Sequence, residues 1–126
     1  MLPLTHQAEA LLRHLVGLLP EIDPYRPETF TTYKKVHDDL GLAKVGRSWG
    51  ESLMALGLVE LAKWAQDQGL PAITGIVVSG ETYEPGKGYF SLHEPNQNAY
   101  AWWRDEIIKA KEFSWNEVLK TFAPVR

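Results

Sequence analysis

The side chains that could do chemistry in this sequence are four histidines, scattered carboxylates and a glycine-rich loop. The histidines lack the spacing of metal ligands, and consecutive residues of a helix, such as those of the run HDD at 37–39, point in different directions. Nothing in the spacing of the carboxylates requires them to pair for acid–base catalysis. The histidines are His6, His14, His37 and His93. We therefore expect a protein that is not an enzyme and that needs no metal or other cofactor.

The glycine-rich run GETYEPGKG at residues 80–88 is similar in composition to a phosphate-binding loop. Five residues separate Gly80 from Gly86, where a phosphate-binding loop has four, and Gly88 stands where a hydroxyl would bind magnesium. Pro85 presets the backbone of a turn, and the glycines permit positive φ angles. The run therefore predicts the turn of a β-hairpin.

Two short helical segments precede this loop and would position a binding surface. Thr32 can cap a helix that Gly41 ends, since glycine readily adopts the left-handed conformation found after helices. Ser48 and Glu51 have the spacing of a capping box, which opens a second helix. Two helices joined by a short turn predict a helix-turn-helix, whose second helix can enter the major groove of DNA.

The remaining pattern predicts an α+β, mostly helical protein of one domain, residues 1–126. A third helix is expected at 58–68, a buried strand at 72–79, and a partner strand in the run YFSL at 89–92. The helix-turn-helix and this β-hairpin together are winged-helix-like. Additional helices are expected near the N-terminus and, after the hairpin, from about residue 96 to 111 and after a second capping box at Ser114 and Glu117. The C-terminal helices either cover the back of the hairpin or form the surface of a homodimer.

Short motifs in this region resemble the C-terminal domain of the alkylguanine DNA alkyltransferases and the alkyltransferase-like proteins. Thr32 and Tyr33 look like the motif that opens the first helix of that winged helix. Arg47, Gly50 and Leu53 look like its recognition helix. The resemblance implies that Arg47 enters the base stack and that Tyr33 contacts the backbone of a flipped nucleotide.

The reactive motif of that family is absent. Where the family has Pro-Cys-His-Arg, this chain has Ile73, Thr74, Gly75 and Ile76, and it contains no cysteine. Alkyl transfer is excluded because it needs a thiolate nucleophile. The strand and hairpin are also similar to those of small bacterial or phage proteins with no assigned activity.

The composition is that of a globular protein: of 126 residues, 44% are hydrophobic and 23% are charged. No apolar stretch approaches 18 residues and no leader pattern is visible, so we expect a cytoplasmic protein with no membrane partner. The formal charge of −3 opposes general nucleic-acid binding. However, residues 26–51 contain five basic and four acidic side chains, whereas residues 52–103 contain two basic and five acidic ones. The expected helix-turn-helix is therefore the less acidic of these two segments.

Two functions follow as hypotheses. The first is a non-catalytic DNA-binding protein, which requires the basic side chains to share one face without Asp38 and Asp39 between them. The second is a protein–protein interaction module or inhibitor without nucleic-acid binding, favoured by a large exposed apolar patch. The expected DNA contacts are Tyr33, Lys34, Lys35, Lys44, Arg47, Ser48, Trp49, Ser52 and Lys87, and the expected aromatic interaction surface is Tyr83, Tyr100 and Trp103.

Overall fold

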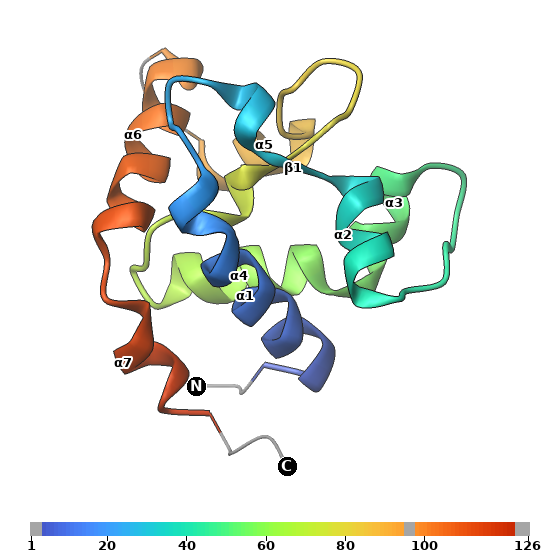
Figure 1. The fold of residues 1–126 in the computed structure, drawn as a ribbon, viewed down its shortest axis with the longest axis horizontal. Helices are drawn as coiled ribbons and strands as arrows, with labels where there is room; N and C mark the ends of the chain where they lie inside the picture. The colour runs from blue at the N-terminus through green and yellow to red at the C-terminus, as the bar shows by residue number, and fades with distance from the viewer. Residues whose placement is uncertain (1–3, 95–97, 123–126) are drawn as a thin grey trace.

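The protein is an α+β fold, mostly helical, in a computed structural model that describes residues 4–94 and 98–122 (Figure 1). Two strands, β1 (Thr31–Thr32) and β2 (Val77–Val78), form a small sheet. The α-helices are α1 (His6–Leu18), α2 (Tyr33–Leu40), α3 (Trp49–Leu53), α4 (Val59–Asp67), α5 (Lys87–His93), α6 (Ala99–Glu112) and α7 (Trp115–Leu119). Single turns of tighter or wider helix are η1 (Leu19–Glu21), η2 (Pro27–Thr29), η3 (Met54–Leu58) and η4 (Ile73–Ile76).

The sheet differs from the expected hairpin. β2 pairs in parallel with β1, with Thr31 opposite Val77 and Thr32 opposite Val78. The partner strand expected at 89–92 is wrong, because these residues lie in α5. Tyr89 is buried in that helix and its hydroxyl donates a hydrogen bond to the carbonyl of Ala72. Helical backbone at 87–93 satisfies its own hydrogen bonds while placing this ring against the core, so no second strand is needed there.

Helices α2 and α3 begin at the caps that the sequence predicts, but the Ser48–Glu51 capping box forms only in part. The Thr32 hydroxyl accepts a hydrogen bond from the amide of Lys35, and Gly41 ends α2 with a φ angle of 65°. The Ser48 hydroxyl accepts from the amide of Glu51 at the start of α3. The Glu51 carboxylate accepts from the amide of Arg47, one residue earlier than in a reciprocal capping box.

Helices α3 and α4 are separated by a kink, so the third helix expected at 58–68 is present as α4; we call α3, η3 and α4 together the kinked rod. Between them, η3 is a wide turn in which Gly57 has a φ angle of 132°. Gly57 faces α1, and a Cβ placed there would lie 3.5 Å from the backbone of Ala8. The kink therefore allows α1 to pack closely across the rod.

The core lies where α1, α4 and α6 meet the fully buried segment η4. α1 contributes the apolar stripe that its sequence predicts, including Leu11, Leu12 and Leu15. α6 contributes Trp103 and Ile107 from the opposite side. The C-terminal helices thus pack onto the body of the protein (Figure 1).

The structure contradicts one further capping prediction, and it does not test the expected start of α6. α7 forms, but the Ser114 side chain makes no capping hydrogen bond, so the second capping box is wrong. α6 begins at Ala99 behind the cap Asn98, and the expected start near residue 96 lies outside the described residues. Within residues 4–94 and 98–122, no helix has the length and hydrophobicity of a membrane span.

Candidate functional site

Basic and aromatic side chains gather on the surface of α2, α3 and the loop between them. The ammonium group of Lys34 lies 5.6 Å from the ring centroid of Trp49, and that of Lys44 lies 4.8 Å from it. His37 packs against the same indole, with ring centroids 5.0 Å apart. Cation–π attraction of this kind holds two lysines beside one half-buried tryptophan. We call Lys34, Lys44, Arg47 and Trp49 the helix-turn-helix face.

Acidic side chains form ion pairs with the two lysines of α2. Lys34 forms an ion pair of 2.8 Å with Asp38, and Lys35 approaches Asp39 at 3.6 Å. These carboxylates partly neutralise the two lysines of α2. Lys44 and Arg47 are exposed and have no ion-pair partner within 4 Å among the described residues. The uncompensated positive charge therefore lies on the loop that leads into α3.

Two of the expected DNA contacts instead stabilise the fold. Ser52 is fully buried, and its hydroxyl accepts a hydrogen bond of 2.8 Å from the amide of Val45. The side chain of Ser52 thus fixes the loop between α2 and α3. Tyr33 is 9% exposed, and its hydroxyl accepts a hydrogen bond of 2.8 Å from the amide of Gly86. The sequence pattern did not distinguish the residues of this segment that face inward from those that face outward.

The remaining expected contacts, Lys35, Ser48 and Lys87, lie at the surface. Ser48 is exposed, although its hydroxyl is engaged by the α3 cap. Lys87 is exposed at the start of α5, within the segment that was expected to form the wing. Of the expected contacts, the structure therefore brings Lys34 and Lys44 to Trp49, and Arg47 lies two residues before Trp49 in the chain.

The expected aromatic surface is divided between core and solvent. Trp103 is buried, and its indole N–H donates a hydrogen bond of 2.9 Å to the carbonyl of Gly75. Tyr83 and Tyr100 are exposed, at 44% and 54%. Trp103 is thus a core residue, and an interaction surface could include only the two tyrosines.

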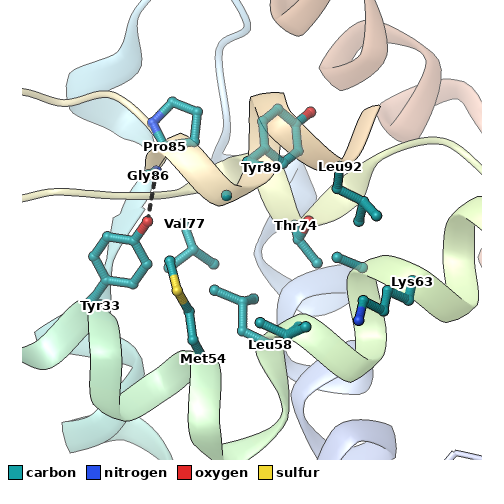
Figure 2. Close-up of a pocket in the computed structure, with 13 residues that line it drawn as sticks. Tyr33, Met54, Leu58, Lys63, Thr74, Val77, Pro85, Gly86, Tyr89 and Leu92 are labelled. Carbon is teal, nitrogen blue, oxygen red and sulfur yellow. Dashed lines mark hydrogen bonds between the residues drawn. The ribbon is translucent and has the colours of Figure 1, made fainter. Parts of the chain in front are cut away.

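An apolar pocket, which the sequence did not reveal, lies beside the helix-turn-helix. It has a volume of about 160 Å³ and is lined by residues from α2, the kinked rod of α3 and α4, β2, and the segment 85–92. Figure 2 shows Tyr33 and Pro85 at one end of the pocket and Lys63 and Leu92 at the other. The wall between the two ends includes Met54, Leu58, Val59, Ala62, Thr74 and Val77. We call this cavity the Tyr33–Lys63 pocket.

Few polar atoms line the Tyr33–Lys63 pocket. The Thr74 hydroxyl is buried and has no hydrogen-bond partner in the described chain. Burial raises the pKa of Tyr33, although the hydrogen bond from the Gly86 amide acts in the opposite direction. The Tyr33 hydroxyl consequently stays protonated at neutral pH and keeps a proton to donate. Lys63 is exposed and has no ion-pair partner within 4 Å among the described residues.

The pocket depends on the glycine at position 86. A Cβ there would lie 3.0 Å from the Tyr33 hydroxyl and 3.2 Å from the Met54 methyl group. The only local sign of the pocket in the sequence is the spacing of Val59, Ala62 and Lys63, which places them on one face of a helix. That spacing does not tell whether the face is filled by other side chains.

The part of the chain that the structure describes contains no cluster of three or more metal-ligating side chains. Comparisons with family models, with curated proteins and with solved structures found no significant match.

Proposed function

We propose that the protein is a non-catalytic DNA-binding protein that contacts duplex DNA through its helix-turn-helix face. The observation that carries the proposal is the exposure of Lys44 and Arg47, without ion-pair partners among the described residues, directly before α3. Phosphate contacts by such side chains supply most of the affinity of non-specific DNA binding. The proposal requires only α2 and α3, and it does not depend on the other elements of a winged helix.

The charges of the face indicate a weak, salt-sensitive interaction. The ion pair with Asp38 partly neutralises Lys34. The face therefore offers about three phosphate contacts, from Lys44, Arg47 and Lys34. For three contacts, affinity should fall roughly 40-fold between 50 and 200 mM salt. Trp49 lies between the lysines and adds an aromatic edge for contact with sugar or base.

The resemblance to the alkyltransferases adds a role for Arg47, which is to enter the base stack. Its exposed position one residue before the cap of α3 supports this role. For Tyr33, burial and the hydrogen bond from Gly86 favour a structural role over contact with a flipped nucleotide.

The test is fluorescence anisotropy of a short labelled duplex at 50 and 200 mM salt, with the wild-type protein and three variants. Arg47→Ala should weaken binding and reduce the slope of log affinity against log salt by about one. Arg47→Lys should keep the slope but lose any preference for duplexes that contain an unpaired base, because lysine is a point charge without a planar group. Lys120→Ala is the control, since Lys120 is exposed and directly follows α7, a helix that lies away from α2 and α3 (Figure 1).

No binding at 50 mM salt would overturn the DNA proposal. It would leave the alternative, a protein–protein interaction module, with Tyr83 and Tyr100 as its exposed aromatic side chains. If binding occurs, sedimentation of the complex tells whether one or two copies bind, which tests the homodimer that the sequence analysis gave as an alternative.

A further inference from the structure

The Tyr33–Lys63 pocket has features that DNA contact by the helix-turn-helix face does not use. It is walled almost entirely by carbon atoms, and about 160 Å³ is close to the volume of a cavity known to hold a benzene molecule. A dry apolar cavity of this size loses dispersion contacts unless a ligand or side chain occupies it. The pocket therefore suits the body of one small apolar molecule.

The polar groups at the two ends of the pocket indicate which polar group the ligand carries. Lys63 lies at one end in Figure 2, and it is the only charged side chain among the lining residues. The buried Thr74 hydroxyl lacks a partner in the described chain, and the Tyr33 hydroxyl accepts from Gly86 while retaining its own proton. An ammonium group and two hydroxyl donors complement hydrogen-bond acceptors on a ligand, above all an anionic one.

The side chains of the pocket wall favour a ligand with an aromatic ring. The Met54 thioether and the ring of Tyr89 lie on the lining, and sulfur and aromatic edges contact planar rings favourably.

We propose that the Tyr33–Lys63 pocket binds a small aromatic carboxylate, with its ring against Met54 and its carboxylate beside Lys63. This binding is independent of DNA and does not rest on the function proposed above. With about ten non-hydrogen atoms, such a ligand should bind with a Kd in the millimolar range or somewhat tighter. The pocket makes no covalent bond to it, because no activated nucleophile lines the cavity.

Met54 is a spectroscopic probe of this pocket. Its two methionines are Met1 and Met54, so protein labelled with ¹³C at the methionine methyl groups gives one signal from the pocket and one reference signal. We would titrate this protein with phenylacetate, with the neutral isostere phenylacetamide and with the cation 2-phenylethylamine. Phenylacetate should shift the Met54 signal at low millimolar concentration, about threefold more tightly than phenylacetamide, and the amine should bind most weakly.

Two variants measure separately how the Lys63 charge and the apolar cavity contribute to the affinity for the ligand. Lys63→Met keeps the length of the side chain but removes its charge, so the preference for phenylacetate over phenylacetamide should disappear while phenylacetamide binds as before. Ala62→Leu places three more carbons in the cavity and should reduce the affinity for both ligands at least tenfold. Lys120→Met is the matched control for Lys63→Met and should leave all three affinities unchanged.

Four results would overturn the proposal. One is a Met54 signal that none of the three compounds shifts at 10 mM, and another is equal affinity of the wild-type protein for phenylacetate and phenylacetamide. The third is a preference for phenylacetate that persists in Lys63→Met. A Met54 signal that responds to a duplex with an unpaired base, but not to phenylacetate, would assign the pocket to a nucleobase instead.

Discussion

The amide of Gly86 donates a hydrogen bond of 2.8 Å to the hydroxyl of Tyr33, and this contact joins the segment after β2 to the first residue of α2. Gly86 and Tyr33 also line the same pocket, so the hydrogen bond helps to define its shape. The pair therefore couples the helix-turn-helix to the part of the chain that was expected to form the wing.

Tyr33→Phe should lower the free energy of unfolding by about 1–2 kcal/mol, because the partly buried Gly86 amide loses its acceptor. Urea unfolding followed by tryptophan fluorescence measures the change. Tyr25→Phe is the control, since Tyr25 is 68% exposed and its loss of a hydroxyl should change stability by less than about 0.5 kcal/mol. Equal effects of the two substitutions would show that the contact with Gly86 contributes nothing.

Gly75→Ala and Gly17→Ala should change stability in opposite directions. A Cβ at Gly75 would lie 2.5 Å from the hydroxyl of the buried Tyr89, and we expect a loss of about 3 kcal/mol from overpacking. Gly17 lies within α1 with open space around it, so alanine there should add about 0.5–1 kcal/mol through helix propensity. Thermal unfolding of both variants provides the comparison, and a stable Gly75→Ala protein would contradict the packing of Tyr89 against η4.

His93 should make the protein less stable in mild acid. Burial lowers the pKa of His93 below its ordinary value near 6.5, with the Glu106 carboxylate acting in the opposite direction. As the pH falls below about 6.5, the unfolded chain takes up this proton before the folded protein does, so the free energy of unfolding decreases until the pH reaches the depressed pKa.

The measurement for His93 is urea unfolding at pH 7.5 and 5.5. The wild-type protein should lose more stability over this interval than His93→Gln, whose side chain does not titrate. Identical pH dependence of wild type and His93→Gln would contradict the effect of burial.

Ser52→Ala should cost about 1–3 kcal/mol and loosen the loop between α2 and α3. The Ser52 hydroxyl is buried, and the amide of Val45 would lose its acceptor. Hydrogen exchange at the Val45 amide measures the local effect and urea unfolding the global one. Ser91→Ala, at an exposed position of α5, should stay within about 0.5 kcal/mol of wild type. Unchanged protection of the Val45 amide would show that Ser52 does not hold this loop.

The local features that depend on a few neighbouring residues could be predicted from the sequence. Thr5, Thr32 and Ser48 cap helices where the sequence predicts caps, and Gly41 takes the left-handed conformation after α2. The apolar stripe of α1 is buried as its spacing predicts. These features follow from hydrogen bonds and steric limits within about four residues, so they need no knowledge of the rest of the chain.

The segment against which each element packs could not be predicted in this way, because it depends on the fold of the whole chain. The run at 87–93 has strand-like residues but folds as α5, because Tyr89 then reaches the Ala72 carbonyl and the core. β2 pairs with β1, far away in the sequence, and periodicity cannot predict such a pairing. The burial of Ser52 and Trp103 and the Tyr33–Lys63 pocket also arise where distant segments meet, and packing between such segments is set by the whole chain.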